Sequence, residues 1–292
     1  METTKQNSSQ WRTILWAGLP VYFAANIYLL AIGEIIGVVL LLAYALYRTL
    51  LSWFTKRVTE PQPTEIKTSS EKQSILLAQS GVIAFVILLT AFPDVVPLWS
   101  EMVNWAARLG ETFLPVEWFG GPGNAVANPL QYFIIPFVAL LLMGVRSADM
   151  GLGKGHKVWP ACLVWLALPL LIWIGLLATG NLSAQVFVRR ILSNTFRNGF
   201  FEEFLFRGAL QTWLRHLFSQ PITLTLQAIL FGLWHLRAKT ASMDGDVLAG
   251  LALCIVSQTI AGLALGYIFE RTRNLIAPSV THVVMNALGQ TF

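Results

Sequence analysis

The feature that most limits the fold of this chain is a long apolar run near its start. From Thr13 to Tyr47 the only charged residue is Glu34. As one helix the run would measure about 50 Å, whereas the hydrocarbon core of a bilayer is roughly 30 Å thick. We therefore predict two membrane helices that turn near Gly33 and Glu34, with one strongly tilted helix as the alternative.

The composition extends this prediction to the whole chain. Hydrophobic residues make up 55% of the 292 residues and charged residues only 12%, whereas soluble domains carry roughly 25% charged residues. We predict an all-α fold, a polytopic transmembrane helical bundle with about eight membrane segments. The net charge of +5 fits the excess of Lys and Arg in cytoplasmic loops and does not indicate a nucleic-acid partner. We predict no cleavable signal peptide, so the first apolar run stays as an anchor.

The charged loops give a predicted orientation. Residues 48–73 carry five basic residues and two prolines, Pro61 and Pro63, whereas residues 93–128 carry one basic residue. Residues 146–157 carry three. We predict that the first and third loops are cytoplasmic and that the second lies outside. Residues 1–12 are predicted to be frayed, and the predicted spans between the loops are 74–91, 132–145 and 159–178.

The segments that follow Gly180 are shorter and more polar. For this reason we divide the chain into an N-terminal membrane region of unassigned role, residues 1–180, and a second region, residues 181–292. The second region is predicted to hold, in chain order, an amphipathic interfacial helix at 186–198, a helix at 198–217, a helix at 221–235, a polar loop at 236–246, a span at 247–269 and a last helix that opens near Pro278.

Three ionisable residues lie within the predicted helix 198–217. An ionisable group at membrane depth is costly, so by default it marks a functional site. Glu203 and Arg207 stand four positions apart with the acid first, and they can pair on one helix face. Glu202 is rotated by about 100° from Glu203, so it is left free to act on another group. The structural alternative is an ion-pair cluster that only holds helices together.

Two further helices carry polar pairs at the same spacing. His235 follows Phe231 by four residues, and Asn286 follows His282 by four, so each pair lies on one helix face. Polar groups in a bilayer must find one another or water. We therefore predict that these helices and Glu202 face a common cavity. The structural alternatives are an interfacial histidine at a helix end and hydrogen bonds that join helices.

This set of side chains suits hydrolysis. A free carboxylate next to an imidazole can hold a water and take its proton, which is worth about 10²–10⁴ in rate. An amide and a second imidazole can donate hydrogen bonds to the oxyanion of a tetrahedral intermediate, worth about 10²–10³ per donor. The two cysteines, Cys162 and Cys254, lie in apolar segments and show neither a disulfide pattern nor metal-site spacing.

The three motifs, in this order, resemble the CAAX-protease and bacteriocin-processing (CPBP, or Abi) family of intramembrane proteases. The resemblance covers residues 196–290 and implies a membrane endopeptidase with a site inside the bilayer, accessible from the cytosol. It makes residues 181–292 the catalytic core and the bacterial cytoplasmic membrane the expected location. The matching words are Glu202-Glu203-x-x-x-Arg207 with Phe204-Leu-Phe-Arg-Gly208, Phe231-x-x-x-His235, Gly266-Tyr-Ile-Phe-Glu-Arg271 and His282-x-x-x-Asn286.

The same resemblance implies a role for each motif residue. Glu202 would activate the water and His235 would help to position it. His282 and Asn286 would form the oxyanion site. Three further residues would have supporting roles. Glu203 and Arg207 would hold the geometry of the site, and Phe231 would pack its wall.

The family has been classed both as metalloprotease and as glutamic protease. We expect no cofactor and no metal, because neither histidine lies in an H-E-x-x-H pattern. Zinc is the alternative, since a carboxylate and two imidazoles are zinc ligands. Its ligands would be Glu202, His235 and His282.

Two other functions compete with the protease. One is a non-catalytic immunity or maturation factor that binds a peptide in the same cavity. The other is a transporter, because buried acids and histidines also relay protons, although no repeat relates the two halves of the chain. The expected partners are the lipid bilayer and a peptide or membrane-protein tail, a prenylated C-terminus being less expected because bacteria generally lack that modification. Nothing in the sequence specifies an oligomeric state.

Overall fold

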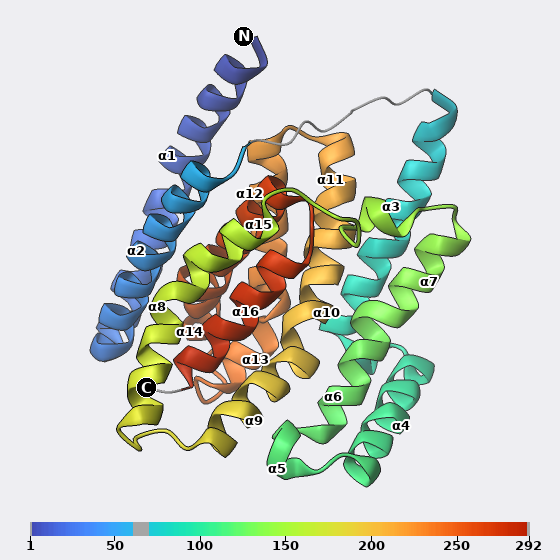
Figure 1. Cartoon of the computed structure of the whole chain (residues 1–292). Coiled ribbons are helices and arrows are strands. Elements are labelled where there is room, and N and C mark those ends of the chain that lie inside the picture. Colours follow the sequence, from blue (N-terminus) through green and yellow to red (C-terminus); the bar gives the residue numbers. More distant parts are fainter. Residues whose placement is uncertain (1, 61–69, 291–292) are drawn as a thin grey trace.

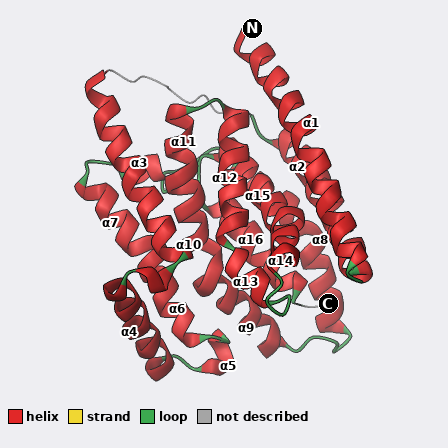
Figure 2. Cartoon of the chain, turned by 180° about the vertical axis from the view of Figure 1, so that it is seen from behind, coloured by secondary structure: helices red, strands yellow, loops and turns green. Residues whose placement is uncertain are grey.

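The computed structural model describes residues 2–60 and 70–290, and this part of the chain is built of helices and short turns without any strand. Long helices lie side by side along a common direction and form one bundle (Figures 1 and 2). Within the described residues six helices are long and apolar enough to cross a membrane. The all-α transmembrane bundle is thus confirmed, while the number of about eight segments stays a prediction.

The first apolar run forms a helical hairpin, which is the predicted arrangement, and not the alternative of one tilted helix. Helix α1 (Glu2–Ala31) and helix α2 (Ile35–Val58) turn at Gly33, whose φ of +94° favours glycine. The predicted fraying of residues 1–12 is wrong for residues 2–12, because α1 begins at Glu2, and residue 1 lies outside the described residues. The predicted loop 48–73 is also shorter than expected, since α2 continues to Val58 and α3 (Ser70–Ala91) begins early. Pro61, Pro63 and Lys67 lie outside the described residues.

The stretch 93–128 is largely helical, which corrects the predicted loop. Its many prolines begin helices rather than break them, because proline fits the first helical turn. Gly110 packs against the start of the helix that begins at Pro122 so closely that an added Cβ would lie 2.1 Å from the Pro122 carbonyl oxygen. The elements are η1 (Pro93–Val95), α4 (Pro97–Phe113), α5 (Val116–Phe119), α6 (Pro122–Pro129), the π-helical turn η2 (Leu130–Ile134) and α7 (Ile135–Leu142).

The middle of the chain agrees with the sequence reading. A 3-10 turn, η3 (Ser147–Met150), lies in the predicted loop and is followed by the span α8 (Val158–Ala178). The predicted amphipathic helix is α9 (Ala184–Asn194), which begins where the Ser183 side chain accepts a hydrogen bond from the Val186 N–H. A π-helical turn, η4 (Thr195–Gly199), joins α9 to the following helix.

After η4 the described chain forms four long helical segments and one short helix. The sequence predicted a polar loop at 236–246, but its first half is helical, since Leu, Ala, Lys and Arg are good helix formers. The first continuous helical segment consists of α10 (Phe200–Glu203), η5 (Phe204–Gln211) and α11 (Thr212–Leu217). It is followed by α12 (Gln220–Trp234) and the short helix α13 (Leu236–Ala241). The next continuous segment consists of α14 (Val247–Leu253), η6 (Cys254–Thr259) and α15 (Ile260–Thr272), and the last helix is α16 (Ile276–Gly289).

Helix α14 begins at a cap that explains where the loop ends. The Asp246 carboxylate accepts hydrogen bonds from the backbone N–H groups of Leu248 and Ala249, at 2.9 and 3.0 Å. The bond from Ala249, with further ones from Tyr28 and Leu248, holds the pKa of the Asp246 carboxyl below its usual value. A charged carboxylate at the positive end of a helix stabilises that end.

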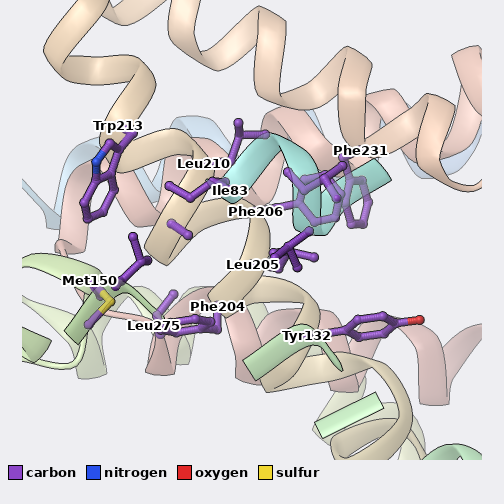
Figure 3. Close-up of a cluster of buried hydrophobic side chains, with 14 of the residues drawn as sticks. Ile83, Tyr132, Met150, Phe204, Leu205, Phe206, Leu210, Trp213, Phe231 and Leu275 are labelled. Carbon is purple, nitrogen blue, oxygen red and sulfur yellow. The ribbon is translucent and has the colours of Figure 1, made fainter. Parts of the chain in front are cut away.

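Helix α15 has a close-packing face. A Cβ added at Gly262 would lie 2.8 Å from the Cα of Ala228 in α12. Small residues let the two backbones approach, as is usual between membrane helices. The core beside this contact is aromatic, and Figure 3 shows Phe206 and Phe231 next to each other at a centroid distance of 5.0 Å.

The bundle has two ends, which we call the N end and the C end after the nearer chain terminus (Figure 1). At the N end Arg271 donates to the Thr59 carbonyl and Ser219 Oγ donates to Gln10 Oε1. At the C end Arg237 pairs with Asp94, on the short segment that contains α13. The start of α10 and the end of α12 lie toward the C end, because the α11–α12 turn lies at the N end.

Candidate active site

Three helices bring a carboxylate and two imidazoles together. Glu202 lies in α10, His235 at the end of α12 and His282 in α16. Glu202 is only 4% exposed and His282 only 7%. Segments that are far apart in the sequence therefore form one buried polar cluster, which is the meeting of side chains that the motifs predict.

The two imidazoles approach the same oxygen of Glu202. The distance from Glu202 Oε2 to His235 Nε2 is 3.8 Å, and the distance to His282 Nε2 is also 3.8 Å. This is too long for a direct hydrogen bond, and Oε2 is a buried atom with no hydrogen-bond partner among the described residues. One water can bond to an oxygen and a nitrogen at this separation.

Neighbouring acceptors fix the direction of both rings. His235 Nδ1 lies 2.8 Å from the Phe231 carbonyl oxygen, which only accepts, so Nδ1–H donates. His282 Nδ1 lies 2.7 Å from Glu203 Oε1 and donates to that carboxylate. Each ring thus turns Nε2 toward Glu202, and in a neutral ring that atom is an acceptor.

The second carboxylate is bound on two sides. Glu203 Oε1 lies 3.0 Å from Arg207 Nη1, and both side chains are fully buried. The sequence predicted this pair, but it did not predict that Glu203 also holds His282. Arg207 in turn donates to the Gly262 carbonyl at 3.2 Å. Removing one partner of such a buried pair costs about 3–5 kcal/mol, because the other charge is left uncompensated.

Phe231 forms the wall of the cluster. Its ring is fully buried and lies 4.7 Å from the His235 ring and 6.1 Å from the His282 ring, measured between centroids. The Arg207 guanidinium lies 4.5 Å from the centre of the Phe231 ring, a cation–π distance. One aromatic side chain thus contacts three of the polar residues.

Asn286 lies one turn beyond His282 on α16. Both residues line a cleft of about 750 Å³ between α2, α8, α15 and α16. Within the described chain no hydrogen bond joins the Asn286 side chain to Glu202 or to either histidine. The structure therefore places Asn286 beside the cluster rather than within it.

The donor set was also compared with a metal centre. Across residues 2–60 and 70–290 no group of three or more His, Cys, Asp or Glu side chains is arranged to hold a metal ion. Zinc ligands lie at about 2.0–2.2 Å from the metal, so Glu202, His235 and His282 would have to move closer together. The absence of a cofactor stays a prediction. Both cysteines are buried and free.

The sequence reading missed one neighbour of the cluster, Tyr132. It lies in the η2 turn, in the N-terminal part of the chain, within electrostatic range of Glu202. Its ring lies 5.2 Å from the Trp234 ring, and Figure 3 shows its hydroxyl pointing away from the aromatic core. Nothing in the spacing of Tyr132 could have revealed this, because the contact is between distant segments.

Comparison with known proteins agrees with the motifs. Residues 183–288 match the family model described as "Type II CAAX prenyl endopeptidase Rce1-like". The matched segment runs from the start of α9 to the end of α16 and contains every motif residue. No curated protein and no solved structure matches the chain.

Proposed function

Because residues 183–288 match the family model of a CAAX prenyl endopeptidase, we propose that the protein is an intramembrane endopeptidase in which Glu202 activates the attacking water. The six apolar helices and this family make it a multi-pass membrane protein with a CAAX-type endopeptidase region. The catalytic assignment below is our own and rests on the geometry of the cluster.

The observation that supports the proposal most strongly is the orphaned oxygen of Glu202. A buried carboxylate oxygen without a partner is costly, and here two imidazole nitrogens lie 3.8 Å from it. A water held by Glu202 and His235 would satisfy the oxygen. That water would also be placed to react.

The chemistry follows from the direction of each group. Glu202 takes a proton from the water, and the water oxygen attacks the peptide carbonyl carbon. The C–N bond then breaks, and Glu202 returns the proton to the leaving amine. His235, fixed by its bond to the Phe231 carbonyl, accepts the second hydrogen bond of the water through Nε2.

His282 and Asn286 serve the oxyanion. The Glu203 carboxylate accepts a hydrogen bond from His282 Nδ1 and so fixes the direction of the ring, as a buried carboxylate does in a catalytic triad. A ring that carries a proton on Nε2 can donate to the oxyanion, and the Asn286 amide is the second donor from the cleft side. Each such donor is worth about 10²–10³ in rate.

The substrate class proposed is a peptide or the tail of a membrane protein that enters from the bilayer. Comparison of membrane-protein termini in cells with wild-type and Glu202→Gln protein tests this. We expect a set of cleaved termini that is lost with Glu202→Gln, while the variant is inserted at the wild-type level. Identical termini in both cells would overturn the protease and favour the non-catalytic factor.

A further inference from the structure

The cleft beside the site is lined by apolar side chains and by basic and amide groups. Its volume of about 750 Å³ lies in the range of specific ligand pockets. The described residues that line it include two cations, Arg48 and Lys239, and no acid. The amide side chains among them are Asn194, Asn198, Gln258, Asn286 and Gln290.

Arg48 lies within a membrane helix, in the region outside the family match. It is part of α2, ten residues before the end of that helix. Its guanidinium lies 4.0 Å from the centre of the Tyr44 ring, and Nη1 donates to the Ser257 carbonyl at 3.2 Å. Among the described residues no carboxylate lies within ion-pair distance of it. A cation at membrane depth without a counter-ion is costly, so it indicates a functional site.

The second cation, like Arg48, lies beside the π-helical turn η6, since Lys239 is within electrostatic range of Cys254. Lys239 is in α13, the short helix at the C end of the bundle, and it is half-buried. Asn194, at the end of α9, donates to Gln290 Oε1 at 3.1 Å in the same region. The lining of the cleft therefore combines Arg48 from α2, polar groups from α9 and α13, and His282 and Asn286 from α16.

We propose that this cleft binds an extended peptide whose carboxylate pairs with Arg48. The inference rests on the proposed protease function and names a feature of its substrate. The occupant needs an anion to meet Arg48 and apolar side chains to meet the walls from α2, α8 and α15. It also needs backbone amides to meet the Asn and Gln side chains, and a peptide supplies all three.

The position of the cleft favours a peptide over a lipid. His282 and Asn286 belong both to the cleft wall and to the motifs, so the occupant lies beside the groups proposed to hydrolyse a peptide bond. The carboxylate has two sources, a free C-terminus or an Asp or Glu side chain. A charge-assisted hydrogen bond is worth about 1.5–3 kcal/mol, which corresponds to about 10- to 100-fold in affinity.

Binding to the full-length Glu202→Gln protein in phosphatidylcholine nanodiscs tests the proposal without hydrolysis. The probe is a fluorescent apolar peptide in three forms: free C-terminus, amidated C-terminus, and amidated with one internal Asp. We expect one acidic form to bind about 10- to 100-fold more tightly than the neutral form, and Arg48→Gln to remove that difference. Which acidic form binds identifies the source of the carboxylate.

Two matched variants separate recognition from folding. Arg57→Gln removes the same charge from an exposed residue on the same helix and should leave the preference intact. Arg48→Lys keeps the charge and should retain part of it. Equal binding of neutral and acidic peptides, or an Arg57→Gln effect as large as that of Arg48→Gln, would overturn the proposal.

A further arm distinguishes a lipid occupant. If phosphatidylglycerol in the nanodisc weakens peptide binding in wild type but not in Arg48→Gln, the site prefers a lipid headgroup and the peptide assignment is wrong. Failure of the protease would appear differently, as peptide binding without any cleavage by the wild-type protein.

Discussion

At the scale of single residues, the adjacent carboxylates Glu202 and Glu203 have different hydrogen-bond partners. Oε1 of Glu203 accepts hydrogen bonds from Arg207 and His282. Each carboxylate keeps one buried oxygen without a partner, but at Glu202 this oxygen lies 3.8 Å from the Nε2 atoms of two imidazoles. The helix explains the difference, because consecutive side chains point about 100° apart. One carboxylate therefore holds the cluster together, while its neighbour is left for water and substrate.

This difference predicts that replacing each acid by Gln has a different effect on the stability of the protein. Glu203→Gln leaves the buried Arg207 without its counter-charge, so we expect a loss of about 3–5 kcal/mol in stability. Glu202→Gln removes no ion pair with Arg207 and should unfold near the wild-type temperature. Thermal unfolding of both variants in the same detergent measures this, and equal melting temperatures would refute the division of roles.

The sequence could predict some of these contacts but not others. The Glu203–Arg207 pair follows from a spacing of four residues on one helix. The bond between His282 and Glu203 joins residues 79 positions apart, and no local pattern encodes such a contact. The same holds for Tyr132, which reaches the cluster from a helix outside the family match.

At the scale of the elements, close contacts between helix backbones determine how the helices pack. The Gly262 carbonyl accepts hydrogen bonds from Arg207 and from Gln227, at 3.2 and 2.8 Å. The absence of a side chain at Gly262 brings α15 near enough to α12 for the bond from Gln227, while Arg207 reaches the same carbonyl from η5. π-helical turns lie on either side of the acidic pair, at η4 and η5, and such turns are frequent at functional sites.

We predict that Gly262→Ala disturbs the site although it touches no proposed catalytic group. The new Cβ would lie 2.8 Å from the Ala228 Cα, so the helices must separate. Overpacking of this kind costs about 1–3 kcal/mol, and the bond from Gln227 to the Gly262 carbonyl should lengthen. Because Arg207 binds the same carbonyl, the change should reach the site. The measurements are melting temperature and turnover.

The matched control is Gly81→Ala in α3, where an added Cβ meets nothing within 4 Å. There the higher helix propensity of alanine should keep or slightly raise the stability. A Gly262→Ala variant as stable and active as Gly81→Ala would contradict the close-packing account.

Apolar runs predicted the long helices well, because membrane spans are set by length and hydropathy. The same rule failed at 93–128 and 236–246, where the composition is typical of loops. In the first case prolines begin helices, and in the second Asp246 caps α14 and leaves a short helix before it. Contacts with neighbouring elements stabilise these segments, and the local composition does not reveal such contacts.

At the scale of the whole molecule, the loop charges and the family resemblance predict opposite orientations in the membrane. The basic stretch 146–157 lies at the N end, which the positive-inside rule assigns to the cytoplasm. The Glu202 cluster lies toward the C end, so this rule gives access from outside. The family resemblance gives access from the cytosol. These two expectations assign opposite ends to the cytoplasm.

We predict that the charge rule holds. Single cysteines replace two exposed residues, Lys154 near the N end and Glu117 in α5, in a chain without Cys162 and Cys254. A membrane-impermeant maleimide added to intact cells should label Glu117→Cys and spare Lys154→Cys. The reverse pattern would place the cluster on the cytosolic side.

The central claim is that Glu202, flanked by two imidazoles, activates the water that cleaves a peptide bond. Turnover by purified wild-type protein, before and after removal of metal ions by a chelator, is the most direct measurement, with Glu202→Gln beside it. Our account predicts unchanged turnover after chelation and a loss of about 10²–10⁴ in rate with Glu202→Gln. Turnover that is lost on chelation and restored by zinc, or full activity in Glu202→Gln, would contradict it.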